Sequence, residues 1–203
     1  MNTHRLLEDN DLNSASLAEQ LAAVSKNGLS IRSIANPTPA VQLAAVQQYG
    51  GVIKYINNPS DAVQLAAVQQ YNEAIRYIRN PSDAVQWAAV QQNSWAIRYI
   101  RNPSAAMQLA AVQKNGTAIQ WIKNPSEAVQ MAAIKCYGSA IEYIKNPSEH
   151  VALIGILGMI HNNLYDKNET YFKSAHQQLK RLHQLHPDSD ELKTIATEIG
   201  VKL

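Results

Sequence analysis

The sequence predicts an all-α fold: a right-handed α-solenoid of six to seven two-helix repeats, closed by a helical C-terminal cap. Three observations predict it. A 22-residue pattern recurs without a register slip, an Asn-Pro pair opens each complete copy, and apolar residues fall at helical spacing within the copies. Units that repeat at a fixed short period build arrays in which each unit packs mainly against its neighbours.

The copies define the organisation of the chain. A degenerate first copy spans residues 14–35, and a seventh starts at Asn146 and loses the pattern after half its length. We therefore expect a lead-in over 1–13, a repeat array over 14–158 and a cap over 159–203. The complete copies begin at Asn36, Asn58, Asn80, Asn102 and Asn124.

Each copy is expected to form two helices. In the copy 58–79, Asn58 is a good N-cap, Pro59 suits the first helical position, and Asp61 has the spacing of a capping box. Asn-Gly and Gly-Gly pairs such as Asn27-Gly28 allow a left-handed turn after the first helix. A shorter second helix follows, for instance Glu73–Arg79, and the next Asn-Pro ends it.

Apolar residues cover most of the first helix of each copy. In the copy 58–79, the residues Ala62, Leu65 and Ala66 join the Val and Ala residues of the predicted core, so the helix is expected to be enclosed. In the second helix, an Ile pair such as Ile75 and Ile78 forms the inward stripe. The core is therefore predicted to consist of Val, Ala and Ile ladders.

The repeated glutamines are expected to mark the narrow solvent-facing strip of the first helices. One row comprises Gln42, Gln64, Gln86, Gln108 and Gln130. A second row, one to two turns further along, comprises Gln47, Gln69, Gln91 and Gln113. In the last copy the corresponding residues are Ala152 and Leu157, which predicts that the C-terminal helices cover the strip there.

The pattern AVxLAAVxxNGxAIxYIxNPS resembles tandem 22-residue helical-hairpin repeats of bacterial and phage proteins, a family of unknown function. The resemblance covers roughly residues 14–158 and is carried by the Asn-Pro pairs, the Ala-Ala pairs and the Ile pairs. It is also loosely similar to HEAT-like α-solenoids. The resemblance implies the fold and a general binding role, with no defined activity.

The outer face of the second helices is the best candidate binding surface, since it carries basic and aromatic rows. Such rows could follow an anionic ligand or stack bases. Alternatively, the Tyr row packs against the next repeat, and the row of Arg79 complements a helix dipole. Trp95 is either an exposed anchor for a protein or a packed groove filler. The candidate residues are Lys54, Tyr55, Arg76, Tyr77, Arg79, Trp95, Arg98, Tyr99, Arg101, Trp121 and Lys123.

The sequence does not predict an enzyme. It has no Gly-rich phosphate loop, no Ser-centred elbow and no paired carboxylates in a shared pocket. Cys136 has no His in its own repeat, which makes a nucleophile there improbable. His176, His183 and His186 lie at helical spacing, but no Cys or carboxylate completes a metal-ligand pattern. We therefore expect no catalytic residue, no metal and no cofactor.

Composition favours a cytoplasmic protein. A single cysteine excludes an intramolecular disulfide and suits a reducing compartment. The N-terminus has no convincing signal peptide, and the longest apolar stretch, Val151–Ile160, is too short to span a membrane. Residues 14–145 hold eleven Lys and Arg against six Asp and Glu, a mildly basic balance without a polybasic segment.

The predicted function is that of a non-enzymatic scaffold that binds a protein partner through the repeat surface. Near-identical central copies suggest recent duplication, which would suit an inhibitor in a conflict between a phage or pathogen and its host. One alternative is nucleic-acid or anionic nucleotide binding along the Arg/Tyr face. The other is a structural homo-oligomer, a homodimer through 151–164.

Overall fold

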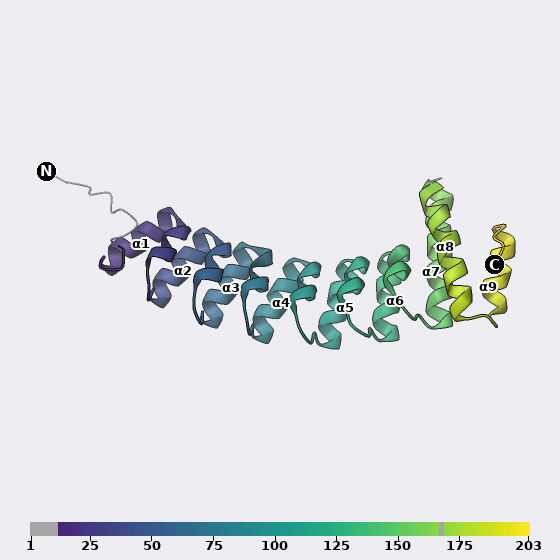
Figure 1. Cartoon of the computed structure of the whole chain (residues 1–203), viewed down its shortest axis with the longest axis horizontal. Coiled ribbons are helices and arrows are strands. Elements are labelled where there is room, and N and C mark those ends of the chain that lie inside the picture. The colour runs from purple at the N-terminus through teal and green to yellow at the C-terminus, as the bar shows by residue number, and fades with distance from the viewer. Residues whose placement is uncertain (1–11, 167–168) are drawn as a thin grey trace. The chain divides into compact units, whose positions relative to one another are not determined.

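The fold was analysed in a computed structural model, which describes residues 12–166 and 169–203, with side chains given except in 161–172. All secondary-structure elements of the described part are helices, and successive helices pack against their neighbours in the manner of a solenoid-like repeat (Figure 1). The predicted all-α solenoid class is therefore confirmed.

Each repeat consists of one α-helix and one 3-10 helix. The α-helices are α1 (Leu17–Lys26), α2 (Pro39–Gln48), α3 (Asp61–Gln70), α4 (Asp83–Gln92), α5 (Ala105–Lys114) and α6 (Glu127–Cys136). The 3-10 helices that follow them are η2 (Gly28–Ser33), η3 (Gly50–Tyr55), η4 (Asn72–Tyr77), η5 (Ser94–Tyr99), η6 (Gly116–Trp121) and η7 (Gly138–Tyr143). The longer helices α7 (Glu149–Asp166), α8 (Glu169–Leu185) and α9 (Asp190–Glu198) complete the chain.

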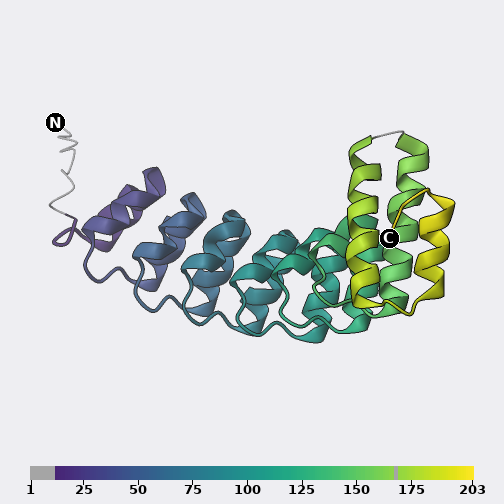
Figure 2. The same ribbon diagram turned by 45° about the vertical axis from the view of Figure 1, so that its right-hand side comes forward.

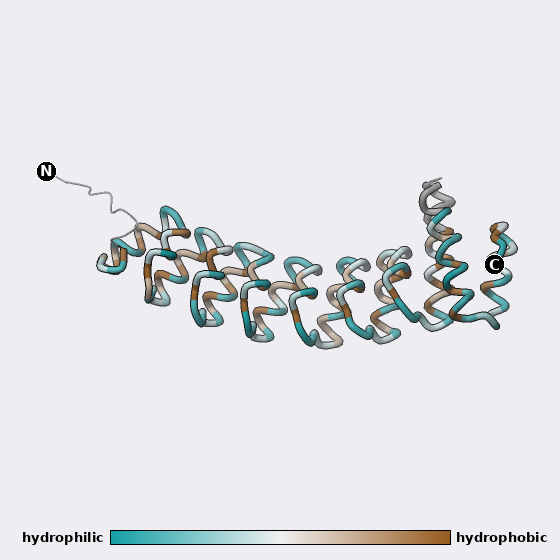
Figure 3. The backbone as a smooth tube through the Cα atoms, viewed as in Figure 1, coloured by the Kyte–Doolittle hydropathy of each residue, from teal (hydrophilic) through white to brown (hydrophobic). Residues whose placement is uncertain are grey.

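The chain divides into two compact units, Met1–Ile100 and Arg101–Leu203. Within the first unit, α1 to α4 lie side by side in chain order, and each of η2 to η4 packs between its own α-helix and the next one (Figures 1 and 2). The second unit repeats this arrangement from α5 to α7, after which α8 packs on α7 and α9 on α8. Hydrophobic stretches recur in every repeat, with hydrophilic loops between them (Figure 3).

The second element of each repeat is shorter than the predicted α-helix. The expected helix Glu73–Arg79 is a six-residue 3-10 helix, Asn72–Tyr77, and Ile78 is its C-cap. A 3-10 helix closes its hydrogen bonds over three residues, so it forms in very short segments. Arg79 therefore lies beyond the helix end, and the predicted interaction of its row with a helix dipole is wrong.

The N-cap of the first helix lies two residues later than predicted. Ser60 has extended backbone angles, and its hydroxyl accepts a hydrogen bond from the Val63 amide; Asp61 is the first helical residue. Asn58 instead adopts a left-handed φ of 50°, a conformation that Asn tolerates. Asn and Ser are both good N-caps, and the capping-box spacing of Asn58 and Asp61 pointed to the wrong one.

The left-handed turn predicted after the first helices is absent. The glycines at these turns instead allow close packing between repeats. Asn27 and its counterparts at the ends of α2 to α6 have extended φ angles, and none of the glycines at these turns has a positive φ. A Cβ on Gly50 would lie 2.4 Å from the carbonyl oxygen of Ala67 in the next repeat. A Cβ on Gly28 would meet the Ala45 carbonyl at 2.7 Å. Glycine therefore lets neighbouring repeats approach closely.

The predicted Val, Ala and Ile core is confirmed in both units. The first Ile of each pair is almost completely buried, as are the Val residues and the second Ala of the Ala-Ala pair in α2 to α6. In α3 and η4 these buried positions are held by Val63, Ala67, Val68 and Ile75.

The first glutamine row is not the solvent-facing strip that the sequence suggested. Gln64 is only 7% exposed, and the other members of the row are half-buried. The Gln64 Nε2 donates to the carbonyl of Pro59 at 2.8 Å, so the side chain braces the Asn-Pro corner. The same bond recurs from Gln42, Gln86, Gln108 and Gln130 to Pro37, Pro81, Pro103 and Pro125. The second row, from Gln47 to Gln113, is exposed as predicted.

Residues that flank the repeat array contact its first and last repeats. Leu12, in the predicted lead-in 1–13, is buried, and Gln20 donates to its carbonyl at 2.9 Å; residues 1–11 lie outside the described part. At the other end, the Arg181 guanidinium on α8 donates to the carbonyls of Ile141, Ile144 and Lys145. Helix α8 thus binds the end of the last repeat.

The predicted covering of the last copy is only half right. Ala152 is fully buried, whereas Leu157 remains 52% exposed beside α9. Ser189 is the N-cap of α9, and its hydroxyl accepts a hydrogen bond from the Leu192 amide. None of the described helices is long and apolar enough to cross a membrane.

Candidate functional site

The eleven predicted binding residues lie on or next to the 3-10 helices. Nine of them are exposed, whereas Arg98 and Tyr99 are half-buried. The residues from Lys54 to Tyr99 belong to the first unit, and Arg101, Trp121 and Lys123 belong to the second.

In the first unit, cations and tyrosine rings alternate along the 3-10 helices, and we name this set the cation–aromatic row. The Arg32 guanidinium carbon lies 5.0 Å from the centre of the Tyr55 ring, and the Lys54 Nζ lies 4.8 Å from the same centre. Further along, Arg76 lies 5.0 Å from Tyr77 and Arg98 lies 4.6 Å from Tyr99. The row comprises Arg32, Lys54, Tyr55, Arg76, Tyr77, Arg98 and Tyr99. These distances are those of cation–π contacts, which fix the direction of the charged groups.

One carboxylate interrupts the row. Glu73 on η4 binds Arg76 in its own repeat at 3.2 Å and Arg98 in the next repeat at 3.3 Å. The Tyr71 hydroxyl also lies 3.3 Å from Glu73, and burial together with this carboxylate raises the pKa of Tyr71. Glu73 therefore bridges two successive repeats and offsets part of the positive charge.

The geometry of the row favours contacts to anionic groups over stacking of bases. Tyr55 and Tyr77 are each less than two-fifths exposed, and each ring already has a cation against it. A base would have to displace this cation from the ring, whereas a carboxylate or phosphate could bind the outward N–H groups directly.

The second unit carries a different surface at the same positions. Gln120 and Glu142 replace the cations, and the Ser174 hydroxyl on α8 donates to Glu142. Trp121 is 43% exposed, and Arg101 and Lys123 lie beyond the ends of η5 and η6. The basic and aromatic residues of this unit are therefore not arranged as the cation–aromatic row is.

Trp95, at the start of η5, is 40% exposed, so it does not fill a closed groove. Its amide donates to the Asn93 Oδ1 at 3.0 Å, which fixes the backbone that presents the indole. Trp87 on α4 is half-buried. Of the two departures from the repeat pattern, Trp95 is the more available to a partner.

A second surface, absent from the predicted site, follows the α-helices, and we name it the α strip. In α3 its members are Ala62, which is exposed, Leu65 and Ala66, which are half-buried, and Gln69, which is exposed. The expectation that Ala62, Leu65 and Ala66 are enclosed is therefore wrong. From α2 to α5 the equivalent positions hold no charged residue. The large apolar members are Leu43, Leu65 and Trp87 in the first unit and Leu109, Met131 and Leu153 in the second.

The α strip is hollowed between α5 and α6 of the second unit. The hollow has a volume of about 540 Å³ and is lined mainly by Leu109, Met131, Ala128 and Ala132, with Gln113, Lys135 and Cys136 at its margin. Cys136 is exposed. The strip therefore offers a depression to apolar side chains as well as a flat face.

Three residues near the cation–aromatic row were not in the predicted set. Arg32 belongs to the degenerate first copy, and its register with Lys54 would have identified it. In the sequence, Glu73 occupies a position whose residue differs between the copies, and this variation alone did not indicate its role. Leu29 takes the place of Glu73 in the first copy. In the described residues, no three His, Cys, Asp or Glu gather as a metal site would require.

Comparison with known proteins gives no relative from which a function could be transferred. The chain matches no protein-family model, no curated protein and no solved structure at a significant level. The resemblance to bacterial and phage helical-hairpin repeats therefore stays a prediction.

Proposed function

We propose that this chain is a non-enzymatic scaffold that binds a protein partner through the α strip. The observation that supports the proposal most directly lies in the first unit, where α2 to α4 each carry one half-buried large apolar side chain of the strip, Leu43, Leu65 or Trp87, and no charged residue at the strip positions. Apolar side chains gathered in a row mark an interaction site more often than scattered apolar residues do.

The composition of the α strip resembles that of a protein interface. The centres of such interfaces are depleted in charged residues and enriched in large apolar and aromatic ones, with polar residues around them. Leu43, Leu65 and Trp87 supply the apolar centre in the first unit, and Gln47, Gln69 and Gln91 border it. Stacked helices hold these side chains in place before binding, which lowers the entropy cost of association.

The test is affinity capture of the tagged chain from its native cells, with quantitative mass spectrometry of the retained proteins. In the test variant, Ala62→Arg and Ala84→Arg are combined. Both alanines are exposed on the α strip, and Arg is a good helix former, so the fold should persist while two long charged side chains block the surface. Circular dichroism should confirm unchanged helicity.

The control variant adds the same charge elsewhere, by Asn57→Arg and Gln120→Arg. Both positions are exposed on or next to the 3-10 helices, away from the α strip, and the equivalent positions of other repeats hold Arg. We expect one protein to be retained stoichiometrically by the wild type and the control, and at least about tenfold less by the test variant, a loss of about 1.4 kcal/mol. Equal retention by the two variants, or no retained protein at all, contradicts the proposal.

An inhibitory role in a phage or pathogen conflict, and a homodimer through 151–164, remain predictions. The side chains of 161–164 lie outside the described residues. Identification of the retained protein tests the first, and light scattering of the purified chain tests the second.

A further inference from the structure

The Glu73 bridge shows how the cation–aromatic row binds a carboxylate. Its two oxygens contact Arg76 at 3.2 Å and Arg98 at 3.3 Å, and these cations come from successive repeats. Arg76 is in turn stacked on Tyr77. A carboxylate placed between two stacked cations of neighbouring repeats is therefore an arrangement that this scaffold already forms.

The same positions two repeats earlier lack the carboxylate. Arg32 and Lys54 occupy the places of Arg76 and Arg98, and Leu29 occupies the place of Glu73. Both cations lie within 5.0 Å of the centre of the Tyr55 ring. In the described part of the chain, no carboxylate oxygen lies within 4.0 Å of either cation. Two positive charges therefore lie against one ring, and an anion near both of them would offset their mutual repulsion.

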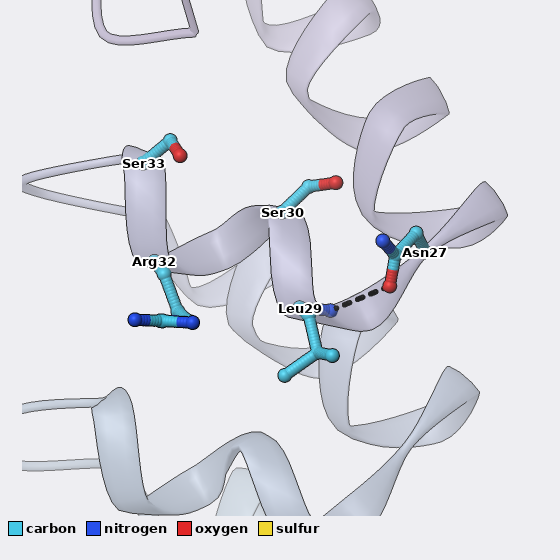
Figure 4. Close-up of a pocket in the computed structure, with 5 residues that line it drawn as sticks. All are labelled: Asn27, Leu29, Ser30, Arg32 and Ser33. Carbon is cyan, nitrogen blue, oxygen red and sulfur yellow. Dashed lines mark hydrogen bonds between the residues drawn. The ribbon is translucent and has the colours of Figure 1, made fainter. Parts of the chain in front are cut away.

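A hollow adjoins Arg32, the first cation of this pair. It has a volume of about 270 Å³ and is lined by Asn27, Leu29, Ser30, Arg32 and Ser33 (Figure 4). In Figure 4 the side chains of Leu29 and Arg32 extend to the same side of η2, away from Ser30 and Ser33. Leu29 is 41% exposed, so the position that Glu73 fills two repeats later is open to solvent here.

We propose that Arg32 and Lys54 form a binding site for a carboxylate side chain from an acidic segment of another protein. The site repeats the Glu73 bridge with the carboxylate supplied from outside. A guanidinium and an ammonium over the same tyrosine ring offer several N–H donors to the two oxygens of one carboxylate. Arg76 and Arg98 already bind Glu73, whereas the first pair, within the described residues, repeats the arrangement without its carboxylate.

An acidic polypeptide fits this surface better than a nucleic acid does. Nucleic-acid affinity depends on the neutralisation of several phosphates along the backbone. The row offers one cation per repeat over four repeats, and Glu73 offsets part of that charge. The tyrosine faces that could stack bases are already in contact with cations. An acidic polypeptide presents single carboxylates at variable spacing, so one of them can bind a row that has a single cation in each repeat.

The test compares two substitutions of Leu29 by fluorescence anisotropy with a labelled oligoglutamate peptide. Leu29→Glu places a carboxylate beside Arg32 and Lys54, as Glu73 lies beside Arg76 and Arg98, so it should occupy the site from within. We expect oligoglutamate to bind about tenfold more weakly to this variant, because a charge pair across the interface is blocked. Leu29→Gln introduces a side chain of the same shape as Glu but without its charge, so this variant should bind oligoglutamate as tightly as the wild type does.

A second variant tests the same site from the other direction. Glu73→Gln removes the negative charge that binds Arg76 and Arg98 and should strengthen oligoglutamate binding severalfold. If both Leu29 variants bind oligoglutamate equally, or if the wild type does not bind it, the proposal is wrong. If single-stranded oligothymidylate of the same charge binds more tightly than oligoglutamate, the site is one for nucleic acid. None of these substitutions touches the α strip, so the outcome is independent of the proposed function.

Discussion

The interior of the hairpins and the surface of the 3-10 helices share one 22-residue period. The interior residues hardly vary from copy to copy, whereas the surface residues vary widely. The buried position of Ile75 holds Ile in six successive copies. The next residue in the sequence, on the surface, is Arg32, Lys54, Arg76, Arg98, Gln120 and Glu142 in those same copies. Packing therefore fixes the interior, and the surface is left to specialise within each unit.

The largest effect should come from shortening a buried isoleucine. Ile75→Ala removes three buried carbon atoms from a side chain that is 1% exposed, and we expect a loss of about 2–5 kcal/mol in the free energy of unfolding. Leu65→Ala removes as many atoms from the half-buried α strip and should cost clearly less. Urea denaturation followed by circular dichroism measures both. Equal losses would mean that the α strip belongs to the core.

A smaller effect is expected where repeats approach most closely. Gly50→Ala would bring a Cβ within 2.4 Å of the Ala67 carbonyl, and such overpacking costs about 1–3 kcal/mol. The matched control is Asn72→Ala, at the equivalent position of the next copy, where the chain already accommodates a Cβ. It should change the free energy of unfolding much less. If Gly50→Ala is as stable as the wild type, close approach does not explain the glycine.

The smallest effect should be that of Glu73→Gln on stability. Its ion pairs with Arg76 and Arg98 lie at the surface, where solvent screening leaves little net contribution. We expect the midpoint of urea denaturation to stay within experimental error of the wild type. A clear loss of stability would show that the cation–aromatic row holds the repeats together, and the contrast between interior and surface would disappear.

The sequence was sufficient to predict the period, the two elements per copy and the Ile ladder, because each depends on packing that repeats with the chain. It could not tell which side of the first helix faces solvent. That helix has Ala, Val and Leu almost all round, so its periodicity carries no directional signal. The burial of Gln64 against Pro59 and the exposure of Ala62 were therefore both missed.

The candidate site was predictable in part. The candidate residues from Lys54 to Tyr99, apart from Arg79 and Trp95, belong to the cation–aromatic row, because a period of one copy places equivalent side chains in line. The role of Glu73 was not predictable, because its contact with Arg98 depends on side-chain geometry between repeats. Leu29 and the hollow beside it depend on the same geometry.

The clasp of Arg181 on the carbonyls of Ile141, Ile144 and Lys145 limits how this protein can be lengthened. Helix α8 holds the edge on which an additional hairpin would have to dock, so new copies can be accommodated only upstream of it. An engineer who wishes to extend the array should insert whole 22-residue modules between central copies, starting at an Asn-Pro pair, and leave the last hairpin next to its clasp.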